Sequence, residues 1–527
     1  MIYHCEDHTC NYWDEGEKLP ERCPQCGRKL LRANEADMTG DDWTALGNTL
    51  WDAEASDKKR MVDCFRKAAY LGSAWGVCNL GICMEQGNGV EADPVQAFWL
   101  YQQAVEMGSL NAVCCLGVCY QYGIGTAPDA KQAAELYCKA AEYGSPRGQM
   151  LLARAFHDGI GVEADAAEAV YWVRAAAYQR YGEGMHRLGV CYEYGDGVEQ
   201  NWERAVHWFR EAAESGVSVA MTDLGYCYEK GCGVEQSWEQ AFSWYRRGAE
   251  CGYPVSMSNL GLCYKRGYGV EQNWQEAIKW YEQGAQCGDL QSMHNLACCY
   301  EHGEGVEQNM TEAIRWYTAA AEGGNADDMY ELGWQYDHGE GVEQDMKKAI
   351  CWYERAAEQN HPAAMNSLGE CYAMGRGVPR DLETAMEWYR RAAELGEAMA
   401  DYNMGWHLEQ AGKLSEAYTH YRKAADGNDD SAWWALGRFY ENGVVVAQDG
   451  KEARRCYETG EKLGSVKCKM RLARCKLLGI GGRRAKKAGL DLCRQALELA
   501  KESSEKEDYG YEAEMNLLRR TIAENES

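Results

Sequence analysis

Two short cysteine pairs near the N-terminus are the residues best suited to chemistry. Cys5 and Cys10 form the first pair, twelve residues follow, and Cys23 and Cys26 form the second. Two such pairs joined by a linker bring four thiolates to one tetrahedral centre, and Gly27 permits a tight turn after the second pair. We therefore predict a metal site whose ligands are Cys5, Cys10, Cys23 and Cys26.

The cysteine spacing resembles a zinc ribbon or a rubredoxin-like knuckle. His8 is an alternative ligand to Cys10, because it follows Cys5 at the more usual two-residue gap. A module of residues 1–33 is too short to build a core alone, so metal binding would supply its folding energy. Structural zinc is expected; iron, which suits the same ligands, is the alternative and implies electron transfer. Four protein ligands close the site, which argues against hydrolytic zinc chemistry.

Behind this module the chain is a repeat array. An aliphatic residue followed by a small one recurs thirteen times, and from Gly81 to Gly405 the step is always 36 residues. Units of this length bury their apolar face only by stacking on neighbours. The small landmark residues are Gly47, Gly81, Gly117, Ala153, Gly189, Gly225, Gly261, Ala297, Gly333, Gly369, Gly405, Gly437 and Ala473.

Each unit is predicted to be a pair of helices. In residues 221–249, apolar residues fall three and four apart in two blocks, which indicates two amphipathic helices, A and B. Gly231 and Gly233 mark the turn between them and are expected to end helix A through positive φ angles. Landmark small residues are expected to let helix backbones approach. The residues expected to fill the space between layers are Trp208, Trp244, Trp280, Trp316, Trp352 and Trp388.

The repeated pattern is A-x-x-x-L-G-x-x-Y-x-x-G-x-G-V, then A-x-x-W-Y-x-x-A-A, over roughly residues 40 to 500. It resembles the Sel-1-like repeat, a relative of the tetratricopeptide repeat. The resemblance implies an all-α, right-handed superhelical solenoid of about thirteen helix-turn-helix repeats, working as an adaptor in protein complexes. The unit from Gly405 to Gly437 has only 32 residues and lacks the Gly-x-Gly-Val turn, so it looks tetratricopeptide-like.

The expected domains are the metal module at 1–33, the solenoid at 38–503, and a capping helix and tail at 506–527. A cysteine ladder follows the repeat, two residues past the landmark. Equivalent atoms in successive layers lie too far apart for a disulfide, so these are expected to be small buried side chains. The ladder comprises Cys83, Cys119, Cys191, Cys227, Cys263, Cys299 and Cys371.

Composition limits the possible partners. With 55 basic and 82 acidic residues, the formal charge is -27, which repels phosphate backbones and anionic lipid. The first residues have no signal-peptide pattern and no long apolar run follows, so a cytoplasmic protein is expected. No catalytic triad order or phosphate-binding loop is recognisable, so we do not expect an enzyme.

If helix A lines the concave face, as the resemblance implies, the position four residues past each landmark points into the groove. We name this position the acidic slot. A cationic or Arg-rich segment would complement it, and Trp334 and Trp406, one residue past their landmarks, could anchor a partner. The acidic-slot residues predicted to bind a partner are Glu193, Glu229, Glu301, Asp337 and Glu409.

Against the acidic background, residues 467–487 are basic, so a head-to-tail self-association is conceivable. This segment carries Lys467, Lys469, Arg471, Arg474, Lys476, Arg483, Arg484, Lys486 and Lys487. The sequence thus predicts a protein interaction scaffold with a structural zinc site. The competing hypothesis is a rubredoxin-like redox or metal-sensing module fused to a docking array.

Overall fold

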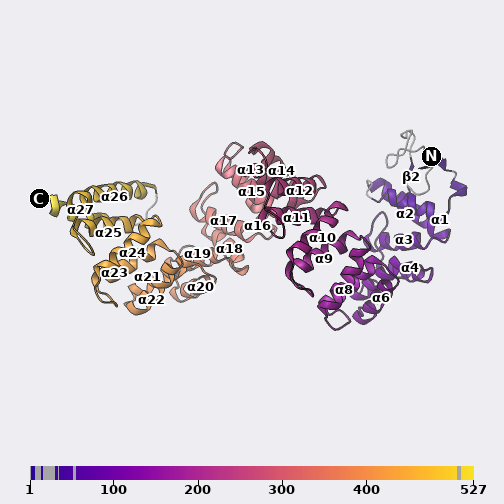
Figure 1. Ribbon diagram of the computed structural model, residues 1–527, viewed down its shortest axis with the longest axis horizontal. Helices are drawn as coiled ribbons and strands as arrows, with labels where there is room; N and C mark the ends of the chain where they lie inside the picture. Colours follow the sequence, from indigo (N-terminus) through magenta and orange to yellow (C-terminus); the bar gives the residue numbers. More distant parts are fainter. Residues whose placement is uncertain are drawn as a thin grey trace. The chain divides into compact units, whose positions relative to one another are not determined.

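The computed structural model describes residues 2–5, 13–15, 30–33, 35–51, 55–506 and 512–526 (Figure 1). Within these residues the chain forms 27 α-helices, one short 3-10 helix and three short strands. It divides into two compact units, Met1–Trp280 and Tyr281–Ser527, and the division falls within helix α14 (Trp274–Gln286). Each unit is a succession of helix pairs, so the predicted all-α repeat fold is confirmed.

The first unit begins with an antiparallel sheet in the order β2-β1-β3, in which Ile2 pairs with both Glu15 and Ala33. Its elements are β1 (Ile2–Cys5), β2 (Trp13–Glu15), β3 (Leu30–Ala33), η1 (Glu35–Asp37), α1 (Gly40–Thr49), α2 (Ala55–Tyr70), α3 (Ala74–Gln86), α4 (Pro94–Glu106), α5 (Leu110–Tyr122), α6 (Ala130–Glu142), α7 (Pro146–Asp158), α8 (Ala166–Tyr178), α9 (Gly182–Tyr194), α10 (Trp202–Glu214), α11 (Ser218–Lys230), α12 (Trp238–Glu250) and α13 (Pro254–Arg266).

The second unit ends with α27 packed on α25 and α26. Its elements after α14 are α15 (Leu290–His302), α16 (Met310–Glu322), α17 (Ala326–His338), α18 (Met346–Glu358), α19 (Pro362–Met374), α20 (Leu382–Glu394), α21 (Ala398–Gln410), α22 (Leu414–Asp426), α23 (Asp430–Asn442), α24 (Gly450–Lys462), α25 (Val466–Leu478), α26 (Lys486–Lys506) and α27 (Glu512–Glu526).

The turn between helices A and B requires both of its glycines. Gly231 ends α11 at φ 74° and its amide donates to the Cys227 carbonyl, 2.9 Å away. At Gly233 (φ 70°), a Cβ atom would lie 2.4 Å from the carbonyl oxygen of Trp202 on α10. The predicted helix end at positive φ is confirmed, and the second glycine also lets the turn approach the preceding repeat.

Within each repeat, an aromatic ring on helix B packs against the landmark glycine on helix A. A Cβ atom at Gly225, for example, would lie 2.6 Å from a ring carbon of Tyr245. We call this helix B position the ring position. The buried rings that face a landmark glycine belong to Phe65, Tyr101, Tyr137, Phe209, Tyr245, Tyr353, Tyr389, Tyr421 and Tyr457.

This contact extends one expectation from the sequence and corrects another. The landmark glycine makes room for a ring as well as for the backbone of helix B: a Cβ at Gly333 would lie 2.5 Å from the Tyr353 ring and 3.2 Å from the carbonyl oxygen of Ala349. The tryptophans that precede the ring position are mostly half-buried at the core edge, and several lie under a guanidinium group, as Trp352 does beneath Arg355 at 4.3 Å. The tyrosine or phenylalanine that follows each tryptophan fills the interior, since its side chain lies closer to the centre of helix B's buried face.

The ring position also ties the end of helix A to helix B. The Tyr245 hydroxyl donates to the Glu229 carboxylate at 2.8 Å, across 16 residues of sequence. In the short unit, α21 and α22 are joined without the longer turn, and Tyr421 still donates to Glu409, now across 12 residues. The loss of four residues from this turn therefore leaves the contact between the ring position and the slot carboxylate intact.

Removing one such hydroxyl should measurably weaken its unit. We expect Tyr245→Phe to lower the free energy of unfolding by about 1 kcal/mol, because the partly buried Glu229 carboxylate loses a hydrogen bond. Urea denaturation monitored by circular dichroism measures the change. Tyr143→Phe, at a solvent-exposed tyrosine, is the matched control; equal shifts for the two variants would contradict the role given to the hydroxyl.

Candidate functional site

The acidic slot lies mostly inside the repeats. Glu229, Glu301 and Glu409 each accept a hydrogen bond from the tyrosine at the ring position of their own repeat, at 2.8, 2.6 and 2.8 Å. Asp337 receives a longer contact of 3.5 Å from Tyr353. Only 4 to 21% of these four side chains is exposed. The slot therefore contributes negative potential to the surface more than direct contact area.

Glu193 differs from the other predicted slot residues. The ring position of its repeat is Phe209, which has no hydroxyl. Burial, together with the nearby Asp223 carboxylate, raises the pKa of Glu193. A hydrogen bond with the exposed Tyr194 hydroxyl opposes this rise in the pKa.

Basic residues from the next repeat also neutralise the slot. Arg376 lies 2.9 Å from Asp337, and Arg438 lies 2.7 Å from Glu409. Sequence reasoning missed these pairs, because the arginine lies 39 residues past Asp337 in one pair and 29 residues past Glu409 in the other, so no fixed spacing signals them. Because each pair joins successive repeats, it stabilises stacking as well as offsetting slot charge.

The two predicted aromatic anchors have different surroundings. Trp334 is half-buried and stacks on His338, with ring centroids 4.4 Å apart. Trp406 on α21 is more accessible, with 42% of its surface exposed. Both lie in the second unit, and Trp406 is the better placed of the two to contact another molecule.

The basic segment at 467–487 is partly neutralised within the fold. Arg471 binds Glu514 of α27 at 2.6 Å, Arg474 pairs with Glu441, and Lys467 lies over the Trp434 ring. Arg471 holds the last helix against α25, and all three side chains are engaged within the fold, so they leave less free positive surface than the sequence alone suggested.

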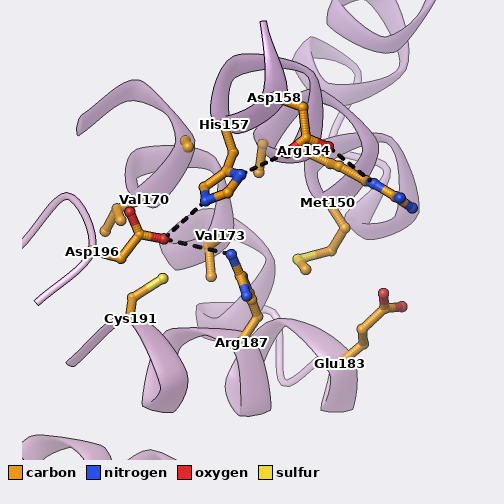
Figure 2. Close-up of a pocket in the computed structure, with 12 residues that line it drawn as sticks. Met150, Arg154, His157, Asp158, Val170, Val173, Glu183, Arg187, Cys191 and Asp196 are labelled. Atoms are coloured by element: carbon orange, nitrogen blue, oxygen red, sulfur yellow. Dashed lines mark hydrogen bonds and ion pairs between the residues drawn. The ribbon is translucent and has the colours of Figure 1, made fainter. Parts of the chain in front are cut away.

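A cavity of about 350 Å³ opens between α7 and α9, with α8 as its floor (Figure 2). Its floor is apolar and buried, formed by Ala153, Ala169, Val170, Val173 and Cys191. Its mouth is polar. The exposed members of the mouth all belong to α7 and α9, the two A helices. The cavity therefore opens on the surface formed by the A helices, which we call the helix A face.

A carboxylate stands fixed at the cavity mouth. Asp196 lies 3.3 Å from Nε2 of His157 and 3.5 Å from the Arg187 guanidinium, and Nδ1 of His157 lies 2.7 Å from Asp158 (Figure 2). His157 and Asp196 occupy the same two repeat positions as Asp337 and Arg376, with the charge order reversed. The arrangement holds Asp196 in place without another molecule.

The cavity is suited to binding rather than to covalent chemistry. Burial raises the pKa of the Cys191 thiol to about 11, so the thiol is protonated at neutral pH. Both ring nitrogens of His157 already contact carboxylates. The chain offers an apolar floor, a fixed acceptor and an open mouth, which are the elements of a small recognition site.

The predicted metal ligands cannot be placed together. Cys5 is the last residue of β1, whereas Cys10, Cys23, Cys26 and the alternative His8 lie outside the described residues. Across the part of the chain that the structure describes, no three His, Cys, Asp or Glu side chains are arranged to hold a metal ion.

The cysteine ladder is confirmed as a row of buried thiols, Cys83 and Cys371 among them. Sequence reasoning missed a pair of interacting cysteines elsewhere in the chain. Cys78 on α3 and Cys115 on α5 interact, and the hydrogen bond from Cys78, together with Arg147, lowers the pKa of Cys115. These cysteines lie outside the ladder, and only their adjacency across two repeats would have revealed the pair.

Comparison with known proteins identifies the repeat. The Sel1 repeat matches residues 76–109, 112–145, 146–181, 182–217, 218–253, 254–289, 290–325, 326–361, 362–397, 398–429 and 432–465. The chain belongs to the Sel1 repeat family. Proteins built from Sel1 and related repeats generally mediate protein–protein interactions, and they are generally not enzymes.

Two solved structures are similar to the chain. A protective antigen of uropathogenic Escherichia coli strains, described as displaying an SLR fold, is 29% identical at a TM-score of 0.57 and matches 81% of this chain and 94% of its own. A Sel1 repeat protein from Oxalobacter formigenes is 31% identical at a TM-score of 0.42, over 46% of this chain and 96% of its own. No curated protein matches the sequence. Among the described helices, none combines the length and apolarity that a membrane span requires.

A half-buried histidine makes the second unit sensitive to pH. His294 on α15 lies 2.8 Å from the fully buried Asp328 on α17, and its hydrogen bonds with the Asp328 carboxylate, which accepts, and with Cys298 raise the pKa of His294 to about 10. The charged imidazole therefore stabilises the fold fully below its usual pKa of 6.5, and this contribution is lost as pH rises towards 10.

We expect His294→Gln to destabilise the second unit by about 2 kcal/mol at pH 6, and by progressively less between pH 6.5 and 10. Urea midpoints for both proteins across this pH range provide the measurement. His302→Gln, at an exposed histidine of the same helix, should show no such trend. A stability difference that stays constant with pH would contradict the ion pair.

Proposed function

We propose that the protein is an interaction scaffold that binds a partner protein or peptide on its helix A face. The observation that carries this proposal is a set of exposed aromatic side chains on the A helices. In the first unit, Tyr122 ends α5, Tyr194 ends α9 and Tyr226 lies on α11. In the second unit, Trp406 lies on α21. Exposed tyrosine and tryptophan provide large contact area at low entropic cost, as interface hot spots do.

The proposed partner segment is basic. The chain carries a net charge of -27, and the slot carboxylates Glu193, Glu229 and Glu301 lie close below the helix A face. Being largely buried, they act through their field, which attracts a cationic segment and raises its association rate. Glu→Lys changes in the slot would break the tyrosine hydrogen bonds, so they do not test binding cleanly.

Exposed tyrosines allow a cleaner test. We expect Tyr122→Ala with Tyr194→Ala to abolish or strongly reduce capture of a specific protein from a lysate of the source cells, because both side chains contribute contact area on the helix A face. Capture at low and high salt, read by mass spectrometry, provides the measurement, and a basic partner should be retained less at high salt.

The matched control is Tyr171→Ala with Tyr178→Ala on α8, a B helix. Tyr171 and Tyr122 are both 59% exposed, while Tyr178 is 70% and Tyr194 is 72% exposed. Equal loss of the partner in both double variants would argue against the helix A face, and capture of no specific protein by the wild type would argue against a constitutive scaffold.

A second proposal concerns the N-terminal cysteines, which we assign to a structural zinc site; iron with a redox or sensing role is the alternative. The sheet register supports it. Cys5 ends β1 and pairs with Leu30, the first residue of β3. The segment with Cys10 leaves β1 at this end of the sheet, and the segment with Cys23 and Cys26 joins β3 there. Soft thiolates suit either metal.

Metal analysis of the purified full chain separates the alternatives. We expect about one zinc per chain, lost in Cys23→Ser with Cys26→Ser and retained in Cys251→Ser, at an exposed cysteine far along the chain. Visible absorption by the purified protein would indicate a ferric tetrathiolate instead. A wild-type chain with no stoichiometric metal would contradict both assignments.

A further inference from the structure

The cavity beside α8 lies where the repeat otherwise places an aromatic ring. Its floor includes the landmark Ala153 and, twenty residues later, Val173, the same interval that separates Gly81 from Tyr101 and Gly117 from Tyr137. In those two repeats, which precede the repeat of Val173 along the chain, the ring is fully buried against the glycine. Val173 is too short to reach the space that a ring would fill, so the cavity follows from the substitution.

Losing the ring does not by itself leave a cavity. At the same interval from the landmark Ala473 stands Cys493, which also has no ring, and its small side chain is fully buried in one core cluster with Ala473. Beside Val173, by contrast, a space of about 350 Å³ remains, which falls within the range of small-ligand sites. This repeat therefore has a cavity at the place that an aromatic ring fills in other repeats, and the cavity is open to solvent.

The mouth supplies the polar partner that a phenol needs. In other repeats the tyrosine hydroxyl donates to a carboxylate, as Tyr101 does to Glu85 at 2.6 Å. In this repeat the slot residue is His157, and the carboxylate at the cavity is Asp196, fixed by His157 and Arg187 (Figure 2). Asp196 is therefore the acceptor for a hydroxyl that enters from outside.

We propose that this cavity receives a tyrosine side chain of the bound partner protein. The inference rests on the proposed scaffold function and specifies one contact of it. A polypeptide source follows from the position of the mouth: Asp158 at the mouth ends α7, and the equivalent residues of the neighbouring repeats are the exposed Tyr122 and Tyr194. A chain lying across these ends contacts both tyrosines and inserts a ring between them.

The mouth also selects against a phosphorylated ring. Three carboxylates, Asp158, Asp196 and Glu183, line it. The two arginines there already approach carboxylates, Arg154 at 3.4 Å from Asp158 and Arg187 at 3.5 Å from Asp196. A dianionic phosphate would meet net negative charge, whereas a neutral phenol donates a hydrogen bond to the Asp196 carboxylate.

The test uses the full chain and three probes: N-acetyl-tyrosinamide, N-acetyl-phenylalaninamide and p-cresol. Methionine methyl groups are labelled with carbon-13, and the Met150 resonance, assigned with Met150→Leu, reports on the cavity it lines. We expect N-acetyl-tyrosinamide to shift this resonance with a Kd on the order of 1 mM. The phenylalanine probe should bind more weakly, and Asp196→Asn should remove most of that preference.

Val173→Tyr fills the cavity from within and should lower the affinity for N-acetyl-tyrosinamide at least about tenfold. The fold should tolerate it, because Tyr317 is buried in the same core as the landmark Ala297. If Val173→Tyr alone does not fold, Ala153→Gly with Val173→Tyr restores the glycine and ring of the other repeats. Val95→Tyr, at an exposed valine on α4, is the matched control and should bind as the wild type does.

Three results would overturn the inference: no probe binds, the filled variant binds as well as the wild type, or p-cresol binds while N-acetyl-tyrosinamide does not. The last would show a site for a free phenol that a polypeptide cannot reach. Probe binding is measured without any partner, so its failure leaves the scaffold function standing. Conversely, a chain that binds the tyrosine probe but captures no protein would contradict the scaffold function while retaining the cavity.

Discussion

The contact between a helix B ring and a helix A glycine is the constraint on which the repeat depends. A Cβ at Gly225 would overlap Tyr245, so the landmark must stay small wherever the ring is large. The ring hydroxyl then reaches the carboxylate near the end of helix A, as in the bond from Tyr245 to Glu229. An arginine of the following repeat can add to this, as Arg438 does at Glu409. One packing contact thereby fixes the pair of helices and helps align the next pair.

This arrangement changes the meaning of the acidic residues. Carboxylates at a regular interval suggest a recognition surface when only the sequence is read. In the structure, Glu301 and Glu409 satisfy buried tyrosine hydroxyls, which would otherwise lose a partner on leaving water. Their regular spacing follows from the regular spacing of the rings. Their negative field still reaches the surface, so a structural role and an effect on association rate are compatible.

The sequence was sufficient for the fold because its signals are local. The 36-residue step, the two amphipathic blocks and the positive φ glycines at Gly231 and Gly233 each depend on a few neighbouring residues. It was insufficient for choosing which member of each Trp-Tyr pair lies inside, since adjacent helical residues differ by only about 100° around the axis. The pairing of the basic segment could not be read from the sequence for a related reason: Arg471 meets Glu514 only because α27 folds back on α25.

Positions that depart from the repeat pattern indicate a partner-binding site better than positions that follow it. A position that obeys the repeat is already required for stacking, so its freedom to serve another molecule is small. At Val173 the ring is missing and a signal was present in the sequence, but Cys493 shows that a repeat can also lose the ring and still bury the smaller side chain in its core. Only the packing distinguishes a closed gap from an open recess. In an array of nearly identical units, specificity for one partner must arise where the units differ, because identical units present identical surfaces.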